Sequence, residues 1–217
     1  MSKLKLTQAE IDKLVTVERI DALPTVHGVG CNDVQFQIKI DRKNIWQYRL
    51  WKDMIQRGYD VKTKSARPTY KDVTCCDEWL SFANFVCWVN KEVGYSGKPD
   101  GYQLDKDLIL RGNKHYSPEA CSLVPRAVNA LLNSNGNSRG RYPVGVHFDV
   151  KHDGFAAGLR CGGVRKNIGL FATPEEAFLA YKIAKEAHIK VVALQHKDIL
   201  KPAVFESLMG WEINIDG

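Results

Sequence analysis

The residues best suited to chemistry lie where two carboxylates flank a lysine at the end of an apolar stretch. Asp105, Lys106 and Asp107 follow one another, and His115 stands a short distance further along the chain. A lysine with its ordinary pKa of about 10.4 is protonated at neutral pH, and aspartates on either side favour that charged form. We therefore expect Lys106 to pair with an aspartate or to contact a phosphate. His115 is the nearby imidazole that could accept a proton in its place.

A strand, a loop and a helix must position these groups within residues 101–132. The apolar strand ends at Asp105, and Ser117 is typical of the entry to a turn or helix. The helix that follows carries Asn129. Its apolar residues recur at helical steps: Val124, Val128 and Leu131 or Leu132. This order predicts that polar groups at the end of the strand face those of the helix.

A second concentration of charge lies in the C-terminal half. Between Arg139 and Ala172 there are six Lys or Arg against two Asp, a local excess of +4 in a chain whose net charge is +6. The basic residues are Arg139, Arg141, Lys151, Arg160, Arg165 and Lys166. A basic strand face fits a sheet lying in a DNA groove, where arginines contact guanine edges or phosphates. A solvated sheet surface explains the same charge.

Three short strands and one helix are predicted to carry these charges. The strands run from Tyr142 through YPVGVHFDV, FAAGLRCGG and VRKNIGLFA, with Asp-Gly and Gly-Gly turns between them. Thr173 and Glu176 form a capping box around Pro174, which starts a helix with a stripe of small residues. One helix across one face leaves the other face of the sheet open.

The pattern YPVGV…GFAAGLR…NIGLFATPEEAFLAYKIAKE, within residues 141–193, resembles the Apetala-type (ethylene-response-factor) DNA-binding domain. The resemblance implies a three-stranded antiparallel sheet that binds the major groove of double-stranded DNA. It places the DNA-contacting side chains at His147, Phe155, Arg160, Arg165 and Asn167. His147 and Phe155 stand where that family usually carries an arginine and a tryptophan, so its base preference does not carry over.

Three further basic residues complete the predicted DNA interface. Lys166 belongs to it by its charge and its place in the strand. Arg139 and Arg141 lie in the segment before the strands, where they could enter a minor groove as basic arms do. A solvated linker is the alternative for these two arginines.

Residues 101–132 resemble a second family, the HNH nuclease finger or ββα-metal unit, which in phage-borne proteins is often fused to an Apetala-type module. Those fusions are typically homing-type endonucleases or their relatives. The resemblance implies a Mg²⁺ ion held by Asp105 and Asn129. Lys106 stands where that family has its general-base histidine, and Cys121 where it has the orienting asparagine. The candidate catalytic residues are Lys106, Asp107 and His115, and the changed positions predict a degenerate finger.

The N-terminal half is predicted to be mixed and rich in aromatic core residues. Residues 1–22 are expected to form an amphipathic leader helix, and residues 26–40 a half-buried strand. Aromatic residues at helical spacing predict helices over 45–59 and 74–94. A basic loop, 62–68, is expected between them.

The polar, Gly-rich segment SNGNSRGR marks the expected domain boundary. The prediction is an α+β chain with an HNH-like domain at 1–133, a linker at 134–141, and an Apetala-type domain with a C-terminal tail at 142–217. The first domain is mixed, and the second is a three-stranded antiparallel sheet packed on one helix.

The cysteines and the hydropathy indicate the compartment. Six cysteines occur without a Cys-x-x-Cys pair, which favours reduced thiols over a disulfide framework. No apolar run reaches the roughly 18 residues of a membrane span, and the N-terminus lacks the apolar core of a signal peptide. We expect a cytoplasmic protein, of an infected bacterial host if the phage resemblance holds, with no membrane partner. The oligomeric state is open.

Three functions fit the sequence. The first is a DNA-binding protein that reads double-stranded DNA through its C-terminal sheet and keeps a degenerate nuclease finger. The second is an active, Mg²⁺-dependent DNA endonuclease. The third is a phage protein–protein adaptor that uses the N-terminal aromatic residues as its interface. The sequence support for the adaptor is the tryptophans Trp46, Trp51, Trp79 and Trp88.

Overall fold

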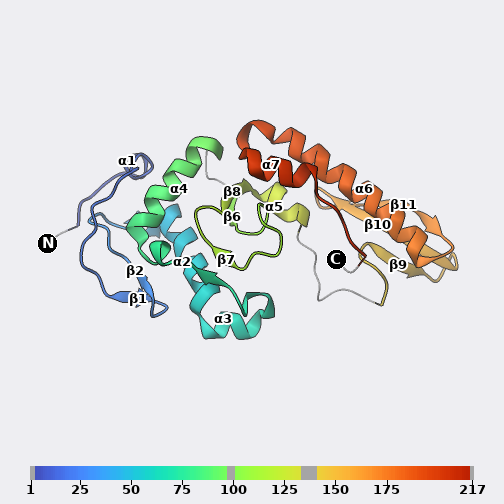
Figure 1. Ribbon diagram of the computed structural model, residues 1–217, viewed down its shortest axis with the longest axis horizontal. Coiled ribbons are helices and arrows are strands. Elements are labelled where there is room, and N and C mark those ends of the chain that lie inside the picture. Colours follow the sequence, from blue (N-terminus) through green and yellow to red (C-terminus); the bar gives the residue numbers. More distant parts are fainter. Residues whose placement is uncertain (1–2, 97–100, 133–140, 216–217) are drawn as a thin grey trace. The chain divides into compact units, whose positions relative to one another are not determined.

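The computed structural model describes residues 3–96, 101–132 and 141–215 and confirms a mixed α+β chain (Figure 1). The chain forms two compact units, Met1–Val124 and Pro125–Gly217. The predicted linker lies outside the described residues except for Arg141. All six cysteines are free thiols. None of the helices in the described part of the chain has the length and apolar character of a membrane span.

The expected leader helix over residues 1–22 is wrong. Only one turn forms, α1 (Gln8–Ile11), which a capping box between Thr7 and Glu10 starts. The chain on either side of this turn runs along a later segment instead. The Leu4 N–H donates to the Gln35 carbonyl at 2.8 Å, and the Ile20 N–H donates to the Asp33 carbonyl at 2.9 Å. These long-range backbone hydrogen bonds take up groups that a continuous helix would have used.

Residues 26–40 bury alternate apolar side chains, as expected of a half-buried strand, but they do not form one strand. Val34 is fully buried and Phe36 is 3% exposed, as the alternation indicates. The chain instead makes two short hairpins. They consist of β1 (Pro24–Val26) with β2 (Gly30–Cys31), and β3 (Lys39–Ile40) with β4 (Lys43–Asn44). Between them, Val34 and Phe36 make isolated bridges to Arg19 and Leu4.

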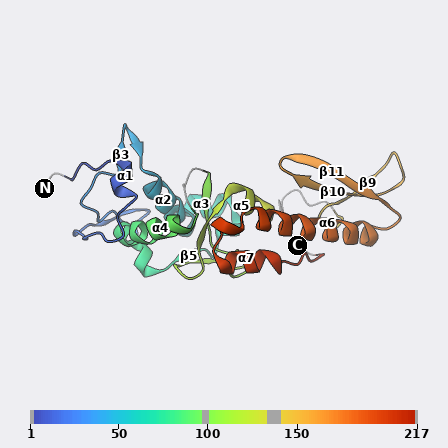
Figure 2. The same ribbon diagram turned by 90° about the horizontal axis from the view of Figure 1, so that it is seen from above.

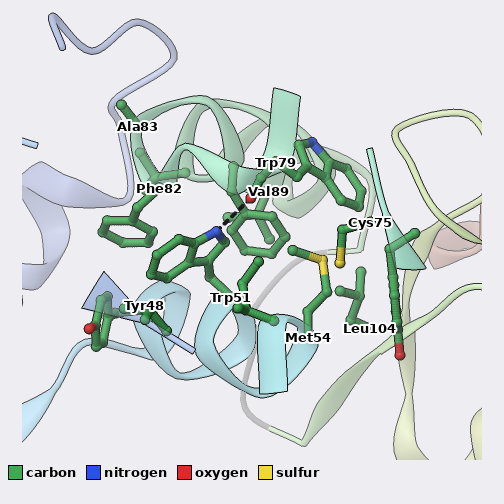
Figure 3. Packing of buried hydrophobic residues seen from close by; sticks show 14 of the residues in the cluster. Tyr48, Trp51, Met54, Cys75, Trp79, Phe82, Ala83, Val89 and Leu104 are labelled. Carbon is green, nitrogen blue, oxygen red and sulfur yellow. Dashed lines mark hydrogen bonds between the residues drawn. The ribbon is translucent and has the colours of Figure 1, made fainter. Parts of the chain in front are cut away.

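Two helices form the centre of the first unit, as predicted, but the second begins at Phe82 and not at residue 74. Helix α2 (Trp46–Tyr59) packs against α4 (Phe82–Ser96). Trp51 and Trp79 are fully buried between them, and the Trp51 Nε1–H donates to the Trp79 carbonyl at 2.7 Å (Figure 3). Burying each such aromatic side chain contributes roughly 1.5–3 kcal/mol to folding. Core packing therefore accounts for these two tryptophans, which the adaptor hypothesis had used as interface residues.

The expected basic loop at 62–68 is largely a helix. Helix α3 (Val61–Ala66) starts at Asp60, whose carboxylate accepts from the Thr63 N–H at 2.8 Å and from the Thr63 hydroxyl at 2.7 Å. Aspartate at this position satisfies a donor that the first turn leaves without a partner. Short elements then lead to α4: η1 (Pro68–Tyr70), β5 (Thr74–Cys75) and η2 (Asp77–Leu80).

Residues 101–132, for which we expected a strand, a loop and a helix, contain short strands followed by a helix. Strand β6 (Tyr102–Asp105) pairs with β8 (Ser122–Pro125), and α5 (Arg126–Leu132) follows β8 directly. Between the two strands, β7 (His115–Tyr116) pairs in parallel with β5. The boundary between the compact units falls at the last residue of β8, so β6 and most of β8 belong to the first unit and α5 to the second.

The second unit contains the predicted three-stranded antiparallel sheet and its helix. Strands β9 (Val146–Asp149), β10 (Gly154–Cys161) and β11 (Val164–Phe171) lie in the order β11-β10-β9. Helix α6 (Pro174–Gln195) starts at the expected capping box and lies along one face of the sheet (Figure 2). The chain ends with η4 (Lys197–Ile199) and α7 (Pro202–Met209), which packs against α6.

Candidate nucleic-acid interface

Strand pairing assigns each side chain of the sheet to one of two faces. Residues directly opposite each other in a ladder point to the same face. On β10, Phe155, Ala157 and Leu159 alternate along the strand and pack with Ala177 and Phe178 of α6. This face is the hydrophobic core of the second unit.

The other face of the sheet gathers polar and basic side chains. On it, Arg160 lies opposite Arg165, Gly158 opposite Asn167, and Ala156 opposite His147. The side chains of Arg160, Arg165, Asn167 and His147 are all exposed. We call these four residues the basic sheet face. Four of the five positions that the Apetala resemblance singled out thus come together on one surface.

Arg165 extends across the middle strand to the far strand of this face. Its Nη2 lies 3.0 Å from His147 Nδ1, although β11 and β9 are not neighbours. The guanidinium crosses above Gly158, where an added Cβ would lie 3.1 Å from Nε of Arg165. The same Nη2 lies 3.3 Å from Nε2 of His147, so the guanidinium contacts the imidazole ring at both nitrogens.

A shallow hollow of about 410 Å³ opens beside these residues. Its lining includes Gly145, His147, Gly158, Arg160 and Arg165. Two glycines leave the backbone accessible between two arginines. The hollow therefore presents hydrogen-bond donors on both sides of a gap that a phosphate or a base edge could enter.

Phe155 and Lys166 lie on the opposite side from the basic sheet face. Phe155 packs into the core beneath α6, with its ring centroid 5.2 Å from that of Phe148 and 5.2 Å from that of Tyr142. Lys166 pairs with Leu159 and is exposed on the helix side of β11. Both residues were expected in the DNA interface, but the alternation of Phe155, Ala157 and Leu159 along β10 places Phe155 on the face that α6 covers.

Arg141, shortly before β9, contacts an aromatic ring. Its guanidinium lies 4.9 Å from the ring centroid of Tyr142, a cation–π contact. Tyr142 thus links Arg141 to the Phe155 cluster, a role that the sequence did not reveal. Arg139, the other predicted linker arginine, lies outside the described residues.

In the first unit, Asp105 acts as a turn cap. Its Oδ1 accepts from the Asp107 N–H at 2.9 Å and from the Leu108 N–H at 2.8 Å. Burial raises the pKa of the Asp105 carboxyl above its ordinary value, and the negative charge of Asp107 raises it further. A carboxyl with a pKa of about 6 is still mostly ionised at neutral pH, but its charged form is less favourable than that of an exposed aspartate.

Lys106 makes the ion pair that its sequence position predicts. Its side chain is 11% exposed, and Nζ lies 3.2 Å from Oδ2 of Asp107. A lysine so deeply buried needs a counter-charge, and Asp107 provides it. Lys106 thus neutralises the Asp107 carboxylate, which the nuclease resemblance had suggested as a catalytic group.

Asn113 braces the same loop through side-chain hydrogen bonds, a role that no sequence pattern indicated. Its Nδ2 donates to the carbonyls of Lys106 and His115, both at 2.7 Å. Its Oδ1 accepts from the His115 N–H at 3.0 Å. One side chain therefore fixes the positions of both Lys106 and His115 through their backbones.

His115 and Cys121, the remaining predicted residues of the finger, differ in exposure. His115 is exposed on β7, with Nδ1 at 2.8 Å from the Thr74 hydroxyl. Cys121 is fully buried in the core of the first unit, and burial raises the pKa of its thiol. A buried thiol packs as a small hydrophobic group.

These donors do not form a fitting Mg²⁺ site. Asp105 uses Oδ1 to cap the turn and is buried where its charge is costly, while Asp107 is paired with Lys106. Mg²⁺ is usually held by one or two carboxylates together with waters and phosphates, and both carboxylates of this loop already have partners. Within the described ranges, no three His, Cys, Asp or Glu side chains are grouped to hold a metal ion. Asn129 lies on α5, in the other unit from Asp105, so their proposed pairing stays a prediction.

Comparison of the chain with protein-family models, curated proteins and solved structures finds no match. Function is therefore inferred from two features: the basic sheet face, and residues 105–116, which we call the nuclease-like loop.

Proposed function

We propose that this protein binds double-stranded DNA through the basic sheet face and that its nuclease-like loop is a scaffold without cleavage activity. The observation that supports the binding surface is the grouping of Arg160, Arg165, Asn167 and His147 on the face that α6 leaves open. The Apetala resemblance points to the same surface. The phage setting, and with it a bacterial cytoplasm, belongs to this proposal through the resemblance alone.

The chemistry of this face suits a DNA groove. Arginine can donate two hydrogen bonds to a guanine edge or to a phosphate, and asparagine can pair with the edge of adenine. The major groove, about 12 Å wide, admits a small sheet or ribbon. Arg160 and Arg165 stand directly opposite each other, so both can reach one groove. When DNA binds, Arg165 would replace its contact with His147 by a contact with a base or a phosphate.

Arg165→Ala and Lys166→Ala test this surface as a matched pair. The two residues are neighbours on β11, both variants remove one positive charge, and only Arg165 belongs to the basic sheet face. We expect Arg165→Ala to weaken duplex binding roughly tenfold or more and Lys166→Ala to leave it nearly unchanged. Fluorescence anisotropy of a labelled duplex at several salt concentrations measures both.

The salt dependence separates phosphate contacts from base contacts. Loss of a phosphate contact lowers the slope of log K against log salt by about one, whereas loss of a base contact keeps the slope and reduces sequence preference. Equal losses in Arg165→Ala and Lys166→Ala would show that only diffuse charge attracts the DNA. That result would reject the basic sheet face as the interface.

The active endonuclease is the second candidate, because strand, strand and helix follow in the order of the resembled finger. A supercoiled plasmid incubated with Mg²⁺ or Mn²⁺, against EDTA, measures cleavage directly. We expect no metal-dependent nicking by the wild-type chain. Nicking that Asp105→Ala abolishes would instead establish an active finger, and Lys106→Ala and His115→Ala would then identify its base.

A further inference from the structure

A second cavity of about 610 Å³ lies within the second unit, between α5, the β10–β11 hairpin and α6. We call it the α5–α6 pocket. Its apolar wall comes from Ala127, Ala130 and Leu131 of α5 together with Tyr181 and Val192 of α6. The cavity is large enough to enclose a nucleotide-sized molecule. It shares Gly145, Gly158, Leu159 and Arg160 with the hollow on the basic sheet face.

Four side chains of this pocket are cationic or can become so, while its other polar side chains, Tyr181 and Gln195, are neutral. Arg160 comes from β10, and Lys185, His188 and His196 come from α6 or its end. Among the described residues that line the pocket, there is no aspartate or glutamate. A half-buried lysine is usually matched by a carboxylate, as Lys106 is by Asp107 in the first unit. Lys185 lacks such a neighbour in the lining.

The pKa shifts of Lys185 and His188 agree with this excess of cationic groups over carboxylates. Burial lowers the pKa of the Lys185 ammonium. Burial also lowers the pKa of His188, and the positive charges of Lys185 on α6 and Lys166 on β11 lower it further. A bound anion would relieve the repulsion among these groups.

We infer that the α5–α6 pocket binds a phosphate group attached to an organic body of nucleotide size. Lys185, His188 and Arg160 would contact the phosphate, and the alanine and leucine side chains of α5 would contact the organic part. The phosphate could belong to a free nucleotide or to the backbone of a DNA that lies on the neighbouring sheet face. The inference does not depend on DNA binding, because a free nucleotide would satisfy the same groups.

The test uses the full chain and follows the ring-proton NMR resonance of His188, assigned with His188→Gln. The probes are inorganic phosphate, deoxyadenosine monophosphate, deoxyadenosine and a DNA duplex. We expect phosphate and the nucleotide to move the resonance, the nucleotide to bind more tightly, and the nucleoside to have no effect. Lys185→Met should weaken nucleotide binding about tenfold or more, because it removes a charged hydrogen-bond donor but keeps the apolar stem.

Lys190→Met is the matched control, since Lys190 is an exposed lysine on the same helix outside the pocket lining. It should leave nucleotide binding unchanged. Circular dichroism of both variants checks that α6 is intact. Equal weakening by Lys185→Met and Lys190→Met would overturn the inference, since it would show general attraction to the charge of the helix.

Sulfate tests the pH dependence, because its charge stays constant over the range in which histidine titrates. An anion beside His188 favours the protonated ring, so binding raises its pKa and affinity should increase as the pH falls. The other charged or titratable groups around His188 are Lys185 and His196 on α6, Arg160 and Cys161 on β10, and Lys166 on β11. In His188→Gln, the remaining pH dependence reports His196.

The duplex identifies the source of the phosphate. A duplex that moves the His188 resonance and competes with the nucleotide assigns the site to DNA, whereas a duplex that binds without moving it assigns the site to a free nucleotide. Both results support the pocket. If phosphate, nucleotide and duplex all leave His188 unmoved, the pocket is rejected, even when the duplex still binds the basic sheet face.

Discussion

Arg165 reaches His147 across a whole strand, with its Nη2 3.0 Å from the imidazole Nδ1. The middle strand allows this because Gly158 has no side chain beneath the guanidinium. An arginine held flat on a sheet has lost part of its conformational freedom before it meets a ligand. Preorganisation of this kind lowers the entropic cost of binding.

A methyl group at position 158 should displace Arg165. In Gly158→Ala the new Cβ would lie 3.1 Å from Nε and 3.4 Å from Nη2 of Arg165, so the guanidinium must shift by a few tenths of an ångström away from its position over the strand. We expect duplex affinity to fall severalfold while stability changes by about 1 kcal/mol or less, since alanine suits a strand better than glycine. Anisotropy and urea unfolding measure the two quantities.

A double-mutant cycle shows whether the effect acts through Arg165. In the Arg165→Ala background, Gly158→Ala should have almost no further effect on affinity. Additive losses would mean that residue 158 contacts the DNA by itself or distorts the sheet.

Gly145 holds the start of β9 against α6. It has a φ of +80°, and an added Cβ would overlap the ring of the buried Tyr181. Gly145→Ala should therefore lower the unfolding free energy by roughly 2–4 kcal/mol, combining backbone strain with overpacking. Urea unfolding followed by circular dichroism checks this loss.

Gly162→Ala separates the two causes. Gly162 also has a positive φ, +56°, but an added Cβ there meets nothing within 4 Å. Gly162→Ala should therefore lower the unfolding free energy by the backbone strain alone, about 1–2 kcal/mol. Equal losses at both positions would contradict the close packing of Tyr181 on Gly145.

Local signals made the second unit predictable from the sequence. The capping box of Thr173 and Glu176 specifies where α6 begins, and the alternation of Phe155, Ala157 and Leu159 specifies which side of β10 faces it. The assignment of Phe155 to the DNA interface came from the resemblance, not from that alternation. Where the two disagree, the structure follows the alternation, because burial of an apolar face dominates the energy of a small sheet.

The first unit was less predictable because its contacts join distant segments. Residues 1–22 have a helical pattern, yet Leu4 and Ile20 donate backbone hydrogen bonds to residues 33–37. The periodicity within the segment cannot indicate a hydrogen-bond partner that lies elsewhere in the chain. The brace formed by Asn113 is hidden for a similar reason, since its acceptors are backbone carbonyls, which every residue carries.

Removal of the Asn113 brace should loosen the nuclease-like loop without unfolding the unit. Asn113→Ala loses two donated hydrogen bonds and one accepted hydrogen bond, and we expect the local opening free energy to fall by about 2 kcal/mol. The His115 amide should then exchange with solvent roughly thirtyfold faster. Leu110→Ala is the control in the same loop, because Leu110 is 61% exposed. Comparable acceleration in both variants would show that the loop opens without regard to Asn113.

The protonation of Asp105 should be visible in the pH dependence of stability. Burial, followed by the charge of Asp107, raises its pKa in the folded chain to about 6, against about 3.9 when unfolded. Below pH 4 both states are protonated, and the contribution of this group to stability is fully present. As the pH rises towards 6, the unfolded state ionises first, so stability is lost until the folded carboxyl ionises as well.

Asp105→Asn keeps the oxygen that caps the turn but cannot ionise, so it should lack this loss. Urea unfolding of both chains from pH 4 to pH 7.5 should show the wild type falling behind the variant by at most about 3 kcal/mol, with most of the difference appearing before pH 6. Asp107→Asn should move the decline to lower pH by removing the neighbouring charge. Parallel curves for the wild type and Asp105→Asn would mean that folding leaves the pKa of Asp105 unchanged, and the objection to a Mg²⁺ site at this loop would then rest only on the turn cap and on the Lys106–Asp107 ion pair.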